Sequence, residues 1–188
     1  RMRPDRIIVG EIRRERQAEV LFEAMHTGHS VYSTLHADTA EQTIRRLINP
    51  PINVPKTLME AVDLNVVMYR DRRENIRRVM QLSEVLAEHR GDETTLSPNV
   101  MYRWRSEEDE IVKQNDSSKL FEQLKMHAGL SRQGIQERLA ERKDILQWMV
   151  DNDIDTVDRV GRVVAEFYQD PDRIVDAVED DDDPDNVL

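Results

Sequence analysis

A carboxylate at the end of a short apolar run is the first group in this sequence that could do chemistry. Ile7, Ile8 and Val9 predict a short buried parallel strand, and Gly10 and Glu11 follow it directly. Ligands of open α/β sheets bind beyond the carboxyl ends of strands, where a carboxylate can orient an attacking water or help to hold magnesium in nucleotide hydrolysis. Glu11 is therefore a candidate catalytic residue, although a strand that ends in Gly-Glu at a surface turn is also a common structural feature.

Two histidines flank the next predicted strand, residues 30–35. His29 lies 18 residues after Glu11, and His36 lies seven residues after His29. A hydrogen-bonded structural role is the alternative for each. We expect no metal site other than nucleotide-bound magnesium, because no other donors stand at ligand spacing. The remaining histidines match no motif and are expected at the surface: His26, His89 and His127.

Residues 3–13 and 27–37 carry a family resemblance. They read Arg-Pro-Asp-Arg-Ile-Ile-Val-Gly-Glu-Ile-Arg and Thr-Gly-His-Ser-Val-Tyr-Ser-Thr-Leu-His-Ala. They resemble the Walker B and histidine boxes of the hexameric ATPases that power type II secretion, type IV pili and archaeal surface filaments. Residues 44–50, 53–55 and 77–85 resemble the archaeal branch of this family, and residues 120–177 do so more loosely.

The resemblance implies a role for each of these polar residues. Glu11 would be the catalytic Walker B residue and would reach Mg²⁺ through a metal-bound water. Gly10 would occupy a position where P-loop enzymes often carry aspartate, and His36 would lie near the terminal phosphate of ATP. His29 belongs to the same histidine box and would contribute to nucleotide binding.

The resemblance also includes an arginine two residues after the Walker B glutamate. Arg13 matches that position and would be catalytic, in phosphate sensing or in a subunit contact. The family usually has a small or acidic residue next, whereas this chain has Arg14. The choice between Arg13 and Arg14 therefore stays open at this point.

One part of a nucleotide site is missing from the sequence. No Gly-x-x-x-x-Gly-Lys-[Ser/Thr] motif occurs in the 188 residues, so the chain has no phosphate-cradling loop of its own. In the family this loop lies upstream, and a chain that begins with Arg1 is expected to be a piece of a longer protein. We expect the chain alone to be inactive, because the groups that stabilise the transferred phosphate are absent.

The predicted elements alternate as in an α/β protein. Helical periodicity and strand-like runs predict a helix over 15–25, a strand over 30–35, helices starting near 38 and 55, and a strand over 64–69. The box formed by Asp38 and Glu41 is expected to cap the second helix. Residues 77–85 and 99–105 predict a β-hairpin with a longish loop that contains Gly91-Asp92 and Ser97-Pro98.

The sequence therefore predicts three parts. Residues 1–106 are expected to be the end of a RecA-like P-loop ATPase domain, from Walker B onward and with the β-hairpin. Residues 107–178 are expected to form a small all-α domain, with Ser131 and Pro171 at helix starts. Residues 179–188 are an acidic segment that lacks a core-forming pattern and is expected to be disordered.

Composition limits the classes of protein that fit. The chain has no cysteine, which excludes disulfides and thiolate metal sites. No apolar run approaches the roughly 18 to 20 residues that a membrane-spanning helix needs. The net charge of −11 argues against general nucleic-acid binding and is also typical of proteins from salt-loving organisms.

The resemblance implies a cytoplasmic homo-hexamer, peripheral at the inner face of the cell membrane. This motor would use ATP and Mg²⁺ to drive protein secretion, or pilus or archaellum assembly, through a membrane-embedded platform protein. Two alternatives remain: a catalytically silent interaction module, and a DNA-translocating ATPase of the conjugation type. Helix-turn-helix DNA binding over residues 117–168 is disfavoured by the acidic residues of that segment.

Overall fold

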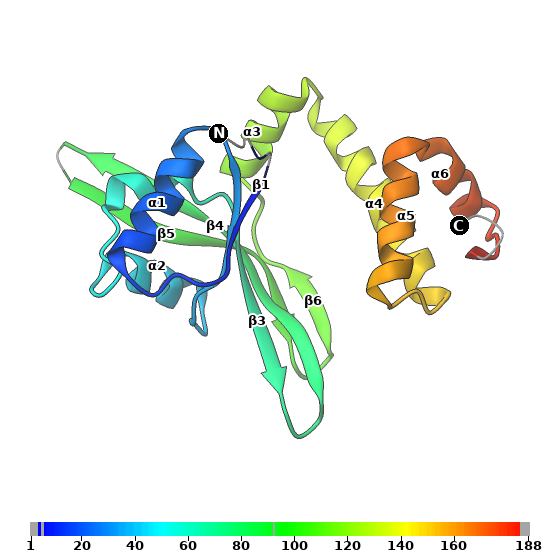
Figure 1. Ribbon diagram of the computed structural model, residues 1–188, viewed down its shortest axis with the longest axis horizontal. Helices are drawn as coiled ribbons and strands as arrows, with labels where there is room; N and C mark the ends of the chain where they lie inside the picture. The colour runs from blue at the N-terminus through cyan, green and yellow to red at the C-terminus, as the bar shows by residue number, and fades with distance from the viewer. Residues whose placement is uncertain (1–3, 5, 92, 185–188) are drawn as a thin grey trace. The chain divides into compact units, whose positions relative to one another are not determined.

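The chain consists of two compact units, Arg1–Gln123 and Leu124–Leu188 (Figure 1). A computed structural model describes Pro4, residues 6–91 and residues 93–184. The predicted boundary after residue 106 lies too early, because Glu110–Lys113 forms strand β6 of the first unit. The acidic composition of residues 107–110 concealed a tight turn followed by a short edge strand.

A parallel strand pair opens the first unit. Strand β1 (Arg6–Val9) pairs with β2 (Ser30–Ser33), and helix α1 (Glu15–His26) connects them. The helix buries Leu21 and Phe22 in the same core that Val9 and Val31 contact, so α1 covers one face of the pair. A helical period after a short apolar run predicted this order of elements, and the structure confirms it.

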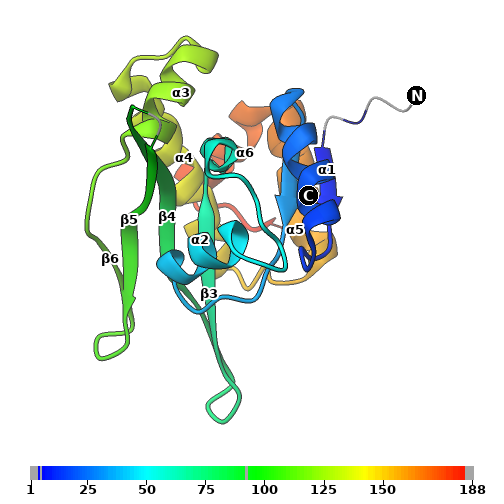
Figure 2. The same ribbon diagram turned by 90° about the vertical axis from the view of Figure 1, so that its left-hand side faces the viewer.

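Helix α2 (Ala40–Ile48) follows the second strand. Its N-cap is Thr39, whose hydroxyl accepts from the backbone of Gln42 at 3.1 Å, so the predicted capping box at Asp38 and Glu41 is wrong by one residue. The backbone N–H of Asp38 donates instead to the Gln42 side chain. Helix α2 packs on the larger sheet, and a 3₁₀ helix, η1 (Lys56–Ala61), leads into that sheet (Figure 2).

The larger sheet has four antiparallel strands in the order β3-β4-β5-β6. They are β3 (Asn65–Asp71), β4 (Ile76–Arg90), β5 (Glu93–Arg105) and β6. The predicted hairpin exists, but its longish loop does not, because residues 86–90 and 93–98 continue the two strands and Pro98 pairs with Val85. Asp92, part of that predicted loop, lies outside the described residues.

A buried carboxylate ties the large sheet to the next helix. Glu84 of β4 has no exposed surface, and its oxygens accept from three backbone N–H groups that open helix α3 (Lys119–Ala128). The distances are 2.7 Å from Ser118, 3.1 Å from Lys119 and 2.9 Å from Leu120. Asn99 donates a fourth hydrogen bond at 2.8 Å. Glu84 therefore supplies from a strand the acceptor that an N-cap residue would otherwise provide.

An arginine–aspartate pair joins the β3–β4 hairpin to the turn between β5 and β6. Arg78 donates from Nε and Nη2 to the two oxygens of Asp109 at 2.7 and 2.6 Å, and Trp104 donates its indole N–H at 2.8 Å. The Trp104 ring lies 5.2 Å from that of Tyr69. The hydrogen bonds from Arg78 and Trp104 lower the pKa of the Asp109 carboxyl from 3.8 to about 2, and the bond from Arg78 has the larger effect.

This cluster predicts an unusual titration. A carboxyl with a lowered pKa contributes stability above its unfolded pKa and loses it as the pH falls through the folded value. We therefore expect the Trp104 indole N–H resonance to stay constant from neutral pH down to about pH 3 and to shift with a midpoint of about 2. Asp109→Asn should abolish this shift. A midpoint near 3.8 in the wild-type chain would contradict the assigned contacts.

The second unit is helical. Helices α4 (Arg132–Asp151), α5 (Val157–Gln169) and α6 (Pro171–Glu179) enclose a core that includes Trp148, Val163 and Ile174. The predicted N-cap at Ser131 is confirmed, since its hydroxyl accepts from the Gly134 backbone at 3.1 Å, and Pro171 begins α6 as predicted. None of the helices in the described part of the chain is both long and apolar enough to cross a bilayer.

The start of the predicted disordered segment differs from the expectation. The Asp182 N–H donates to the carbonyl of Ala177, and the Trp148 indole donates to the Asp182 carbonyl at 3.2 Å. Pro184 is buried. The segment that follows α6 is therefore ordered and contacts the core of the helical unit, which its acidic composition did not indicate. Residues 185–188 lie outside the described residues.

Candidate functional site

The parallel pairing of β1 and β2 brings two loops together. Because the strands run in the same direction, residues 10–13 and 34–38 leave the pair at the same edge. The Ile12 N–H donates to the Thr34 carbonyl at 2.9 Å, and the Thr34 hydroxyl donates to the Gly10 carbonyl at 2.6 Å. These two hydrogen bonds join the loops and position the side chains that the loops carry.

Glu11 lies at the centre of this edge. Its Oε2 lies 2.5 Å from Nη2 of Arg13, and its Oε1 lies 3.3 Å from Nε2 of His36. The side chain of Glu11 is 23% exposed, whereas those of Arg13 and His36 are 70% and 82% exposed. The structure thus brings together the three residues predicted to be catalytic.

The surroundings keep Glu11 ionised. The hydrogen bond from Arg13 is the largest cause of its lowered pKa, and the nearby charges of Arg13, His36 and Arg46 act in the same direction. Partial burial opposes them without reversing the shift. Because an ionised carboxylate only accepts hydrogen bonds, a His36 ring that bonds to it must carry hydrogen on Nε2. Glu11 is therefore available as a base or as an acceptor for a metal-bound water.

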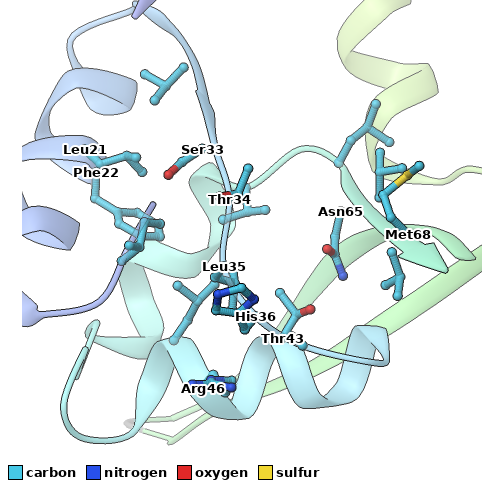
Figure 3. A pocket seen from close by; sticks show the side chains of 18 of the residues that line it. Leu21, Phe22, Ser33, Thr34, Leu35, His36, Thr43, Arg46, Asn65 and Met68 are labelled. Carbon is cyan, nitrogen blue, oxygen red and sulfur yellow. The ribbon is translucent and has the colours of Figure 1, made fainter. Parts of the chain in front are cut away.

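A hollow of about 350 Å³ opens beside this carboxylate, lined by Glu11, Arg13, His36 and the Pro-rich turn after α2. A larger groove of about 580 Å³ adjoins it at Ile12, His36 and Arg46. Figure 3 shows this groove, with Phe22 and Met68 on opposite sides. Its lining mixes apolar side chains with polar ones, among them Ser33, Thr43, Arg46 and Asn65.

The structure separates His29 from this cluster. His29 precedes β2 and its Nδ1 lies 3.1 Å from the Thr27 hydroxyl and 3.3 Å from the Ala24 carbonyl, at the end of α1. A strand rises about 3.3 Å per residue, so the four residues of β2 hold His29 and His36 more than about 10 Å apart. Within the described chain, His29 has contacts typical of a structural residue.

The choice between the two arginines has a geometric answer. Arg13 contacts Glu11, whereas Arg14 is the N-cap residue of α1 and its backbone N–H donates to Gln17 at 3.2 Å. Gly10 contributes its carbonyl, and a Cβ at this position would meet no atom within 4 Å in the described chain. Neighbouring atoms therefore do not explain a glycine at position 10.

Sequence reasoning missed Arg46. This residue lies in the last turn of α2, lines both hollows, and its charge contributes to the lowered pKa of Glu11. No motif marks it, because its role depends on how α2 packs. Helical periodicity offered one weak signal, since Ile44 and Leu47 point into the core and leave Arg46 on the flank of the same helix.

Comparisons with known proteins identify the family of this chain. A sequence model of the type II/IV secretion system protein family matches residues 1–150. The uncharacterized protein MJ0900 of Methanocaldococcus jannaschii is 34% identical over 176 residues, which are 90% of this chain and 31% of that protein.

Two shorter matches have functional names. The type IV pilus assembly ATPase PilB of Pseudomonas aeruginosa is 51% identical over 49 residues, 26% of this chain and 9% of PilB. The conjugal transfer protein TrbB of Rhizobium radiobacter is 43% identical over 76 residues, 37% of this chain and 23% of TrbB. The chain spans less than a third of each of these three relatives. The family resemblance is thus confirmed, and the chain belongs to the type II/IV secretion system protein family.

Proposed function

We propose that this chain is the Walker B and histidine-box half of a secretion or pilus-assembly ATPase. The observation that carries the proposal is the Glu11 carboxylate, held ionised by Arg13 and His36 where two parallel strands end. The family and the name of PilB support it. The longer protein would be a cytoplasmic homo-hexamer at the inner membrane face that drives secretion, or pilus or archaellum assembly, through a platform protein.

The donor set fits magnesium-bound ATP. When bound, Mg²⁺-ATP supplies the phosphoanhydride and the charge that polarises it. Glu11 would accept a hydrogen bond from the attacking water or from a water on the metal. Arg13 holds the Glu11 carboxylate in place and keeps it charged, and His36 would exchange its bond to Glu11 for one to the terminal phosphate. Arg46 adds positive charge at the same edge.

The parallel pair also supports a RecA-like core that further strands complete. Ile8 and Tyr32 are 81% and 58% exposed on the face away from α1, and a two-stranded sheet is marginal by itself. In the adjoining groove, the hydroxyl of Ser33 is buried without a hydrogen-bond partner in the described part of the chain. We propose that the half with the phosphate loop covers these surfaces.

Two other functions have an observation behind them. The missing phosphate-loop motif favours a catalytically silent interaction module. The similarity to TrbB favours a DNA-translocating ATPase. ATP hydrolysis by the longer protein would exclude the first, and stimulation of that hydrolysis by DNA, with no effect of a secretion partner, would favour the second.

The chain alone should not bind ATP tightly or hydrolyse it. It lacks the backbone amides and the lysine that hold the β- and γ-phosphates, and these groups supply most of the electrostatic stabilisation in P-loop enzymes. Titration with a fluorescent ATP analogue should show no saturable binding in the micromolar range, whereas the longer protein should bind under the same conditions. Micromolar binding to these 188 residues would contradict the proposal.

A further inference from the structure

Four arginines form an exposed cluster at the β3–β4 hairpin, which we call the arginine patch: Arg70, Arg72, Arg73 and Arg77. Arg70 and Arg77 stand directly opposite each other across the two strands. Like charges in this position repel and destabilise a strand pair. Within the described residues, none of the four guanidinium groups has a carboxylate at ion-pair distance, and the Asp71 side chain instead accepts from the backbone N–H groups of Arg73 and Glu74.

The two faces of this hairpin differ. Tyr69 and Arg78 pair across the strands on one face, where the Asp109 and Trp104 contacts occupy them. Side chains alternate along a strand, so Arg70 and Arg77 lie on the other face. Met68 shares that face and is 62% exposed. The patch therefore consists of guanidinium groups around an apolar side chain, without an aromatic ring on which a nucleic-acid base could stack.

The helical unit has the opposite charge. Residues 124–188 contain 17 acidic and 8 basic residues, a net charge of −9 out of −11 for the whole chain. On α5, Val157, Val164 and Tyr168 are 89%, 45% and 74% exposed and recur at helical spacing. We call these three residues the α5 stripe. Exposed aspartates lie near its ends: Asp155, Asp158, Asp170 and Asp172.

A glycine lies within this stripe. Gly161 is in the middle of α5, where glycine disfavours a helix, and a Cβ there would meet no atom within 4 Å. Together with Val157, Val164 and Tyr168 it completes a 4-3-4 spacing along one side of the helix. The missing side chain leaves space for another chain to approach the helix backbone.

We propose that the arginine patch of one copy of this chain docks on the α5 stripe of a second copy. Met68 would pack on the valines, Arg70 and Arg77 would form ion pairs with the flanking aspartates, and a guanidinium would stack on Tyr168. The partner is another copy because the chain supplies complementary charge in its own helical unit. A polyanion such as a nucleic acid is a poorer candidate, because the net charge of −11 would repel it and the patch has no aromatic ring on which a base could stack. This interface rests on the proposed function in one respect, because that function implies an assembly of several copies.

Charge reversal and complementation test this interface without ATP. Sedimentation velocity of the 188-residue chain should show self-association at about 0.05 M salt that weakens about tenfold or more at about 0.5 M, since the contacts are ionic and exposed. Arg70→Glu with Arg77→Glu should abolish it, and so should Asp155→Lys with Asp158→Lys. Mixing these two variants should restore association, because each keeps one intact surface.

A matched control changes the charge equally elsewhere. Arg16→Glu with Arg90→Glu alters two exposed arginines outside the patch and should associate like the wild-type chain. Circular dichroism confirms that each variant is folded. The proposal is overturned if the chain stays monomeric at low salt, if the patch variant still associates, or if the mixture of the two reversed variants does not.

A further outcome would assign the patch to a different ligand. In that outcome the wild-type chain binds single-stranded DNA or vesicles containing anionic lipid, and the Arg70→Glu, Arg77→Glu variant loses this binding but still self-associates. None of these readouts depends on Glu11, so failure of this proposal is distinguishable from failure of the proposed ATPase function.

Discussion

Glu11→Gln in the longer protein should lower the ATP turnover number by about 10³-fold or more and leave the dissociation constant for ATP within about threefold of the wild-type value. The amide keeps the shape of the side chain, but it cannot take a proton or bind a metal-bound water as strongly as the carboxylate does. In the proposed enzyme, the affinity for ATP would depend mainly on a phosphate loop that these 188 residues do not contain. The loss should therefore appear in turnover and not in binding.

The measurement compares steady-state hydrolysis with equilibrium binding of ATP. Glu19→Gln is the matched control, because this exposed glutamate of α1 lies outside both hollows and should leave both constants unchanged. Turnover near the wild-type rate in Glu11→Gln would remove Glu11 from the catalytic role. A parallel loss of ATP affinity would show instead that the residue holds the nucleotide.

Glu84→Ala should reduce the free energy of unfolding of the first unit by about 3 kcal/mol or more. The change removes the common acceptor of three backbone N–H groups and of Asn99, and it leaves these donors without their partner beside a buried cavity. Urea denaturation at neutral pH measures the loss. Glu88→Ala, an exposed position on the same strand, should change stability by less than about 0.5 kcal/mol.

The same carboxylate should make stability depend on pH. Burial alone would raise the pKa of Glu84, but hydrogen bonds from Leu120, Ser118 and Asn99 outweigh it and the net pKa lies below the ordinary value of 4.5. A group with a lowered folded pKa stabilises above its unfolded pKa, and that contribution disappears as the pH falls through the folded value. The stability difference between wild type and Glu84→Ala should thus be constant above about pH 5.5 and shrink below about pH 4.5. A difference that grows on acidification would contradict the assigned hydrogen bonds.

Local patterns predicted the elements around the site. The apolar run of β1, the helical period of α1 and the β-branched run of β2 each indicate their structure without tertiary information. Strand β6 was missed because only Ile111 and Val112 interrupt its charged residues, and its pairing with β5 decides its conformation. The ordered conformation of residues 180–184 was missed for a similar reason. It depends on a hydrogen bond from the indole of Trp148, which lies far from them in sequence.

The sequence predicted those residues of the site that directly follow the two paired strands. Glu11 and His36 follow two strands that pair in parallel, so the order of elements places them together. His29 stands at the other end of β2, and motif membership could not show that separation. Arg46 and Glu84 act through packing between segments distant in sequence, and no local spacing marks either residue.

We infer that the edge holding Glu11 and His36 forms half of an ATP site. A structure of the longer protein with a non-hydrolysable ATP analogue and magnesium tests it most directly. We predict that the γ-phosphate lies within hydrogen-bonding distance of His36, with a water between that phosphate and the Glu11 carboxylate. A nucleotide bound away from the carboxyl ends of β1 and β2, with the contacts of Glu11 to Arg13 and His36 unchanged, would contradict the claim.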